Sequence, residues 1–159
     1  MSDRRIVLIS GSFEYDSEES LVILRDYLHV NAPVTCDLVT FCTETDDVSL
    51  APIEDADAVV LFARRLETKG VELERFQRYC RAGRPLIGIR TASHAFQHWL
   101  EPDQEILGGN YDGPLEAGQE TAVQLAPDCE HDILDEIEPF PAYGALYRNT
   151  PLAEDASVL

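Results

Sequence analysis

The most informative part of the sequence is Pro85-Leu86-Ile87-Gly88-Ile89-Arg90-Thr91-Ala92-Ser93-His94-Ala95-Phe96. It predicts a short buried strand, a tight turn and the first residues of a helix. In an open α/β sheet such a turn lies at the carboxyl end of a strand, which is where ligands bind. Several enzyme classes carry a nucleophile on this turn. Here the turn holds arginine, threonine, serine and histidine but no cysteine, so catalysis, binding and a purely structural role all remain open.

Three further apolar runs predict strands of the same kind. None of them alternates apolar and polar residues, and continuous apolar runs are typical of parallel strands covered on both faces. The four predicted strands cover residues 5–10, 34–41, 58–62 and 85–89.

Helical patterns separate these strands. One helix begins where Asp16 or Ser17 can cap its first turn. Another covers residues 68–82 and is followed by a glycine that can end it. A third, Ser93–Trp99, begins at a serine cap and stops before Pro102. Strands and helices in alternation predict an α/β fold, with a mostly parallel sheet between two layers of helices.

The second half of the chain is turn-rich and acidic. Residues 108–114 predict a loop, and residues 121–125 and 143–147 predict two more strands, joined by the acidic segment 128–138. We find no internal repeat and no linker, so we expect one domain over residues 1–159.

The charge of the chain limits its partners. Thirty acidic residues against twelve basic ones give a formal net charge of −18, and Lys69 is the only lysine. Such a chain repels phosphate backbones, so nucleic acid is not an expected partner. A salt-adapted host remains open, because high ionic strength screens the repulsion. The sequence has no apolar run of about 18 residues and no signal-peptide pattern, so we expect a cytoplasmic protein without a membrane partner.

Cysteine and histidine spacing predicts no metal site and no cofactor. The four cysteines are Cys36, Cys42, Cys80 and Cys129. They form no C-x-x-C pair, so we expect buried free thiols. His94 and His98 have the i, i+4 spacing of a zinc-binding pair, but the sequence offers no obvious third ligand.

Three stretches resemble the ThuA-like (trehalose-utilisation type) family of the class I glutamine amidotransferase-like superfamily. They are residues 85–96, residues 106–113 (Ile-Leu-Gly-Gly-Asn-Tyr-Asp-Gly), and His131-Asp132-Ile133-Leu134 with the later Ala145-Leu146-Tyr147. The resemblance covers nearly the whole chain. It implies a flavodoxin-like three-layer sandwich and a role in carbohydrate metabolism. The last five residues resemble the start of a further strand, which leaves a C-terminally truncated form of that fold open.

The chain departs from related amidotransferases at the turn after Gly88. Those enzymes have a Gly-x-Cys-x-Gly pattern there, and aligning Gly88 puts Arg90 in the place of the cysteine. Glutaminase chemistry by a thiolate is therefore not expected. Relatives also often follow the Gly-Gly-Asn-Tyr loop with histidines, where this chain has Pro114-Leu115-Glu116.

The candidate site residues lie at predicted strand ends. His94 is the expected group for proton transfer, because its ordinary pKa lies near neutrality, and Arg90 would hold an oxyanion or hydroxyl. The expected ligand-binding residues are Arg64, Thr91, Ser93, Asn110 and Tyr111. Ser93 most simply caps a helix. A Ser93–His94 dyad looks unfavourable, because neighbouring residues in a helix do not face each other.

Three functions remain open. The first is a ThuA-like protein that binds or converts a sugar or modified sugar at the carboxyl ends of the strands, without glutaminase activity. The second is a non-catalytic binding or interaction module of the same fold, and the third is a hydrolase with Ser93 as nucleophile. The expected partner is a small sugar, and assembly into a homo-oligomer is left open.

Overall fold

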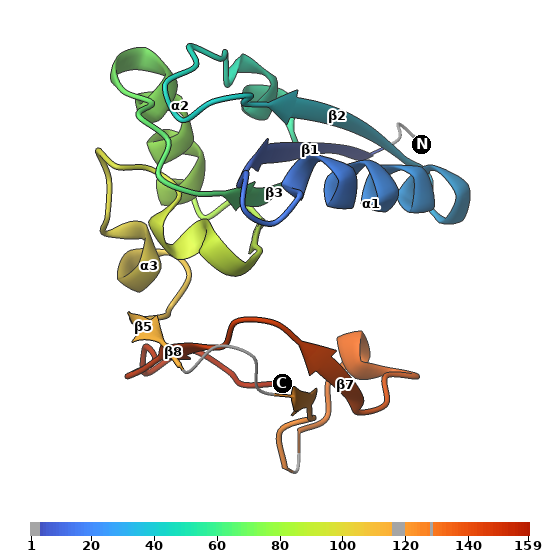
Figure 1. The fold of residues 1–159 in the computed structure, drawn as a ribbon. Coiled ribbons are helices and arrows are strands. Elements are labelled where there is room, and N and C mark those ends of the chain that lie inside the picture. Colours follow the sequence, from blue (N-terminus) through green and yellow to red (C-terminus); the bar gives the residue numbers. More distant parts are fainter. Residues whose placement is uncertain (1–3, 116–119, 128) are drawn as a thin grey trace. The chain divides into compact units, whose positions relative to one another are not determined.

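The computed structural model describes residues 4–115, 120–127 and 129–159 (Figure 1). The chain divides into two compact units, Met1–Leu107 (unit 1) and Gly108–Leu159 (unit 2), and each is described by itself. The expectation of one domain over residues 1–159 stays a prediction.

Unit 1 is built on a four-stranded parallel sheet in the order β2-β1-β3-β4. Its strands are β1 (Arg4–Gly11), β2 (Val34–Thr40), β3 (Ala58–Ala63) and β4 (Leu86–Gly88). All four predicted strands and the α/β class are confirmed. The continuous apolar run of β1 is explained by burial on both faces, since Val7, Leu8 and Ile9 in its middle are each 0% exposed. The expected burial of the fourth strand is wrong, because β4 lies at the end of the sheet and its Ile87 is 59% exposed.

One helix covers each face of this sheet (Figure 1). The helices are α1 (Ser17–Asn31) and α2 (Gly70–Arg81). Leu21 of α1 packs in one cluster with Leu8, whereas Phe76 of α2 packs in the other with Val7 and Ile9. Successive β1 side chains therefore point to opposite helices, as a three-layer arrangement requires.

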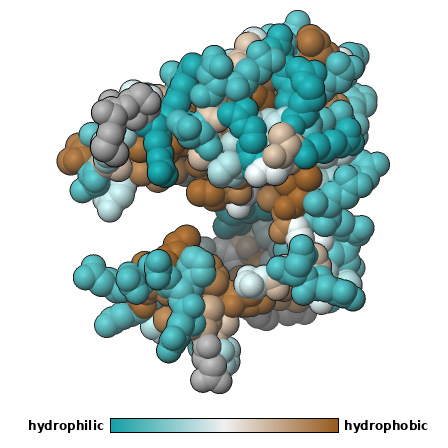
Figure 2. Space-filling view, turned by 180° about the vertical axis from the view of Figure 1, so that it is seen from behind, coloured by the Kyte–Doolittle hydropathy of each residue, from teal (hydrophilic) through white to brown (hydrophobic). Residues whose placement is uncertain are grey.

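The outer face of α1 carries exposed apolar side chains. Ile23, Tyr27 and Val30 of α1 are 63%, 63% and 83% exposed. They recur at i, i+4 and i+7 and so lie on one side of the helix, away from the buried Leu21. We call them the outer stripe of α1. Elsewhere the face of unit 1 seen in Figure 2 is largely hydrophilic, as expected for a strongly acidic chain.

The predicted helix Ser93–Trp99 is wrong. The chain instead forms a short 3₁₀ turn, η2 (Arg90–His94), then pairs with Leu66 and turns at Gln97 and His98. The Leu66 N–H donates to the Ala95 carbonyl at 2.7 Å, and the Gln97 N–H donates to the Leu66 carbonyl at 2.9 Å. This pairing buries Phe96 against Phe76, with ring centroids 4.9 Å apart.

Pro102 was expected to stop that helix and instead begins another one, α3 (Pro102–Glu105). A proline is suited to the first turn, because its missing N–H would have no helical partner there. Ser93 therefore caps no α-helix, and no side chain caps η2.

Unit 2 contains two antiparallel strand pairs. They are β5 (Tyr111–Pro114) with β8 (Tyr147–Asn149), and β6 (Glu120–Val123) with β7 (Phe140–Tyr143). The strand predicted over 121–125 is confirmed in its first part. The strand predicted over 143–147 is wrong, because Gly144 has a φ of 139° and separates β7 from β8. The loop predicted over residues 108–114 is wrong in its second half, which forms β5.

The expectation of buried thiols is confirmed for Cys80 alone. Cys80 is buried and burial raises its pKa to about 12, whereas Cys42 is exposed and Cys36 and Cys129 are half-buried. All four are free thiols. No helix in the described part of the chain has the length and apolar character needed to cross a bilayer.

Candidate functional site

Three side chains that the sequence singled out, together with Arg65, lie on the turns that follow β3 and β4. Arg64 and Arg65 follow β3, and Arg90 and His94 belong to η2, which follows β4. Backbone hydrogen bonds tie these turns together. The Arg64 N–H donates to the Gly11 carbonyl of β1, and the Arg65 N–H donates to the His94 carbonyl, both at 3.0 Å. The turns at the carboxyl ends of the strands, which we call the carboxyl edge of the sheet, therefore carry one connected group of residues.

Hydrogen bonds between buried hydroxyls and backbone groups stabilise the turns of this edge. Thr91 is 1% exposed and its Oγ1 donates to the Ala63 carbonyl at 2.9 Å, with the Ser12 Oγ 3.2 Å away. The Ser17 Oγ accepts from the Ser12 N–H at 2.9 Å and lies 2.8 Å from the Ser10 Oγ. The Thr91 hydroxyl is thus engaged in holding the turns, and its predicted role toward a ligand stays a prediction.

Arg65 and Arg90 have left-handed backbone conformations. Their φ angles are 54° and 50°, which non-glycine residues adopt only at a cost. A strained residue on the turn after a strand is typical of enzymes that carry a nucleophile there, but Arg90 supplies no nucleophile. The Arg90 side chain is exposed, and its guanidinium lies over the Tyr15 ring, 4.2 Å from the centroid.

Arg64 forms an ion pair with Glu14. The Arg64 Nη1 lies 2.8 Å from the Glu14 Oε1, and the Arg64 side chain is 20% exposed. The nearby Glu67 contacts His98, with 3.1 Å between Oε2 and Nε2.

Ser93 and His94 face each other, contrary to the expectation for neighbours in a helix. The Ser93 Oγ lies 2.9 Å from the His94 Nδ1. That expectation assumed an α-helix, whereas Ser93 and His94 lie in a 3₁₀ turn, which is more tightly wound. When the His94 proton is on Nε2, Nδ1 accepts a hydrogen bond from the Ser93 hydroxyl.

His94 is half-buried and its pKa lies below the usual value. Burial is the largest cause, and the positive charges of Arg64 and Arg65 lower the pKa further, against the opposing charges of Asp103 and Glu14. The neutral imidazole therefore predominates at neutral pH. Asp103 belongs to α3 and is 8% exposed, so a buried carboxylate stands near the site.

Asn110 and Tyr111 belong to unit 2, where their contacts support the strands. The Asn110 Nδ2 donates to the Thr150 carbonyl at 2.7 Å, and its N–H donates to the Asn149 Oδ1 at 2.5 Å. The Tyr111 ring packs edge-on against Tyr147, with centroids 5.5 Å apart. Their predicted role in ligand binding stays a prediction.

Sequence reasoning missed three members of the carboxyl edge. Glu14 and Tyr15 follow β1, so the rule that placed Arg64 and Arg90 at strand ends could have found them. Asp103 could not be found in this way, because it reaches the site through α3, which was not predicted. Among the residues that the structure describes, no cluster of three or more His, Cys, Asp or Glu side chains could hold a metal ion.

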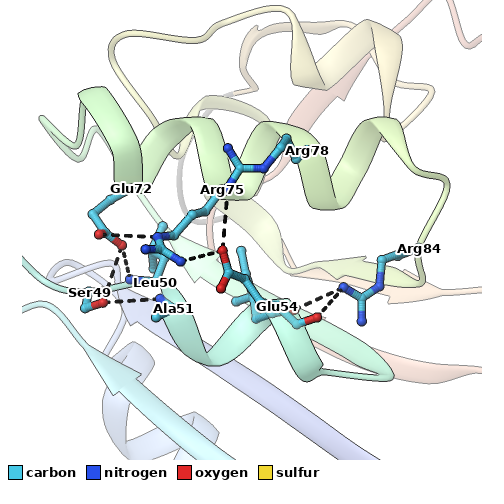
Figure 3. A network of polar contacts seen from close by, with 9 residues as sticks. Ser49, Leu50, Ala51, Glu54, Glu72, Arg75, Arg78 and Arg84 are labelled. Atoms are coloured by element: carbon cyan, nitrogen blue, oxygen red, sulfur yellow. Dashed lines mark hydrogen bonds and ion pairs between the residues drawn. The ribbon is translucent and has the colours of Figure 1, made fainter.

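A second arginine group lies at the opposite, amino edge of the sheet (Figure 3). Arg84 donates through Nη1 to the Glu54 carbonyl at 2.9 Å and the Ile53 carbonyl at 3.3 Å, and through Nη2 to the Ala56 carbonyl. These carbonyls belong to the short 3₁₀ helix η1 (Ala51–Asp55) and its C-cap.

Two arginines of α2 complete this amino-edge group. Arg75 forms ion pairs with Glu54 and Glu72, and Arg78 lies 3.5 Å from the same Glu54 carboxylate. A cavity of about 160 Å³ adjoins them. We call Arg75, Arg78 and Arg84 the amino-edge arginines, and Arg64, Arg65 and Arg90 the carboxyl-edge arginines.

One solved structure places this fold among known proteins. The chain is similar to a Bacteroides uniformis ATCC 8492 protein assigned as ThuA-like, with a TM-score of 0.70 and 17% sequence identity. The match covers 97% of this chain and 66% of that protein, so the chain spans less than two thirds of its length. No family model and no curated protein matches the sequence. The ThuA-like fold implied by the sequence resemblance is thereby confirmed.

Proposed function

We propose that this chain is a ThuA-like protein of carbohydrate metabolism that binds or converts a sugar or modified sugar at the carboxyl edge of the unit 1 sheet. One observation carries the proposal: the turns after two adjacent strands bring Arg64, Arg90 and His94 to the edge where open α/β sheets bind ligands. The ThuA-like fold and the sequence resemblance support the choice of a sugar.

The side chains have the chemistry that such a ligand needs. Arg90 is exposed and oriented by Tyr15, so its guanidinium can donate to a hydroxyl or an oxyanion. His94 has a lowered pKa and is mostly neutral at pH 7, so it can accept a proton from a sugar hydroxyl or from a carbon acid next to a carbonyl. In an enzyme, His94 is the proton acceptor and Arg90 stabilises developing negative charge.

The test is a thermal-shift screen with mono-, di- and 3-keto-sugars. A ligand at 100 times its Kd stabilises the folded state by about 2.7 kcal/mol, which raises the Tm measurably. We expect the shift to disappear in Arg90→Ala and His94→Ala and to persist in the control Arg78→Ala, which changes an amino-edge arginine. An unchanged shift in Arg90→Ala and His94→Ala contradicts the proposal. Binding without turnover favours the non-catalytic module.

The 2.9 Å contact between the Ser93 Oγ and the His94 Nδ1 supports the hydrolase as a second candidate. A serine nucleophile needs a base within hydrogen-bond reach, and a further group to orient that base. Asp103 and Glu14 are the carboxylates whose charge acts on His94. A fluorophosphonate probe should then label wild type but not Ser93→Ala; absence of label on the wild-type protein rules the hydrolase out.

A further inference from the structure

The longest stretch without a negative charge in this acidic chain supplies four arginines to α2 and the turn after it. Residues 75–100 contain five arginines and no aspartate or glutamate, although the whole chain has 30 acidic residues. Four of the five are Arg75, Arg78, Arg81 and Arg84. Basic side chains in the last turn of a helix complement the negative end of its dipole, which accounts for Arg78 and Arg81. It does not account for the cavity that three of these arginines line.

This cavity, of about 160 Å³ at the amino edge, is lined by more guanidiniums than carboxylates. Arg75, Arg78 and Arg84 contribute three positive charges, and Glu54 contributes the one negative charge of the lining. The other lining residues are uncharged and are Ile53, Tyr79 and Ala82. The lining therefore has a formal charge of +2, within a chain of formal charge −18.

Glu54 is too heavily shared to neutralise these arginines. Its Oε1 forms ion pairs both with the Arg75 Nη1 and, at 3.5 Å, with the Arg78 Nη2. The second carboxylate beside Arg75 belongs to Glu72, which also accepts a hydrogen bond from the Leu50 N–H. The Arg78 side chain is 61% exposed and its ion pair is long, so its guanidinium is held weakly and can turn toward a ligand.

Arg84 brings a charge that no carboxylate balances. Its hydrogen bonds end on neutral backbone carbonyls of η1 and its C-cap, and its guanidinium lies 4.5 Å from the centroid of the Tyr79 ring. Among the residues that the structure describes, Arg84 forms no ion pair. Its contacts hold the guanidinium in place, so a ligand meets it at little cost in side-chain freedom. Figure 3 shows Glu54 between Arg75 on one side and Arg84 on the other.

We infer that this cavity binds a phosphate group, either as free phosphate or as a phosphate monoester. A phosphate group carries a charge of about −1.5 to −2 at pH 7, which matches the charge of the lining. Guanidinium groups bind phosphate oxygens through two parallel hydrogen bonds. A carboxylate, with a single negative charge, would balance only half of the lining. The site lies at the other end of the strands from the proposed sugar site, and the inference does not depend on the proposed function.

The experiment compares inorganic phosphate, phenyl phosphate and acetate by isothermal titration calorimetry at about pH 7.5 and fixed ionic strength, where phosphate is mostly doubly charged. We expect at least one of the two phosphates to bind about tenfold or more tightly than acetate. Tighter binding of phenyl phosphate identifies a monoester as the ligand, and tighter binding of inorganic phosphate identifies the free ion.

Two substitutions at the cavity should change the phosphate affinity in opposite directions. Arg78→Gln removes the exposed guanidinium and should weaken binding about tenfold. Glu54→Gln removes the carboxylate of the lining and should tighten binding by about threefold or more, because it leaves the arginines without that competing charge. A loss of folded structure would not tighten binding, so this gain excludes misfolding as the cause.

Arg81→Gln is the matched control. It removes the same charge about one turn further along α2, from a residue outside the cavity lining, and should keep the wild-type affinity. If neither phosphate binds more tightly than acetate, or if Arg78→Gln binds phosphate like wild type, the phosphate site is overturned. Equal weakening in Arg78→Gln and Arg81→Gln also overturns it, because it would show diffuse attraction rather than a defined cavity. These results leave the proposed sugar site in place.

Discussion

Unit 1 holds two groups of three arginines at opposite edges of one sheet, and they are used differently. Two of the amino-edge arginines are engaged within the fold: Arg84 donates to three carbonyls, and Arg75 pairs with two glutamates, whereas Arg78 is exposed (Figure 3). At the carboxyl edge, Arg65 and Arg90 are exposed and carry strained backbone. The number of arginines therefore does not by itself indicate function, because the two groups differ in the exposure and the backbone conformation of their residues.

The largest expected effect is the loss of Arg84. Arg84→Ala removes the donor to the Ile53, Glu54 and Ala56 carbonyls and the contact with the Tyr79 ring. Two of these hydrogen bonds are part-buried and the loss of such bonds is costly, so we expect the free energy of unfolding to fall by about 2 kcal/mol. Urea denaturation measures it. Arg65→Ala is the matched change at the carboxyl edge, and its free energy of unfolding should stay within about 0.5 kcal/mol of wild type. Equal losses of stability in the two variants would contradict the difference between the two groups of arginines.

A glycine substitution should have opposite signs at the two edges. Arg65→Gly relieves a φ of 54°, so the protein should gain about 1 kcal/mol of stability while it loses the guanidinium. Arg78→Gly lies within α2, where glycine costs about 1 kcal/mol relative to good helix formers. Urea denaturation of both variants and of wild type measures these two changes in the free energy of unfolding. A destabilised Arg65→Gly would mean that the side chain is structural.

The smallest expected effect is on the pH dependence of stability, through His94, since the amino-edge group contains no histidine. The pKa of His94 is lowered in the folded state. As the pH falls below the ordinary value of about 6.5, the unfolded chain therefore takes up a proton before the folded protein does, and the free energy of unfolding falls. His94→Gln should lose less stability than wild type between about pH 7.5 and about pH 5.5. Chemical denaturation at both values tests this, and parallel losses would contradict it.

The strands and the two long helices could be predicted because they follow from local sequence. Continuous apolar runs gave the four strands, and periodicity with a terminal glycine gave α2, where Gly83 does adopt a φ of 68°. Ser93–Trp99 could not be predicted in this way. Its conformation depends on pairing with Leu66 and on packing of Phe96 against Phe76, both distant in sequence.

The sequence predicted those residues of the candidate site that directly follow a strand. Arg64, Arg90 and His94 were found from their positions after β3 and β4. The contact between Ser93 and His94 was missed because it depends on the 3₁₀ turn that replaced the expected helix. The exposure of β4 was missed because an apolar run does not show that its strand lies at the end of the sheet, where Ile87 is 59% exposed.

The outer stripe of α1 has a consequence for how this protein behaves in solution. An apolar row on a helix surface invites self-association, and at neutral pH the charge of −18 on each copy opposes close approach. Near the isoelectric point, about pH 4.3, that repulsion vanishes while the row of Ile23, Tyr27 and Val30 remains. The acidic surface thus acts as a colloidal stabiliser, and its removal by titration should turn a dispersed chain into a precipitating one.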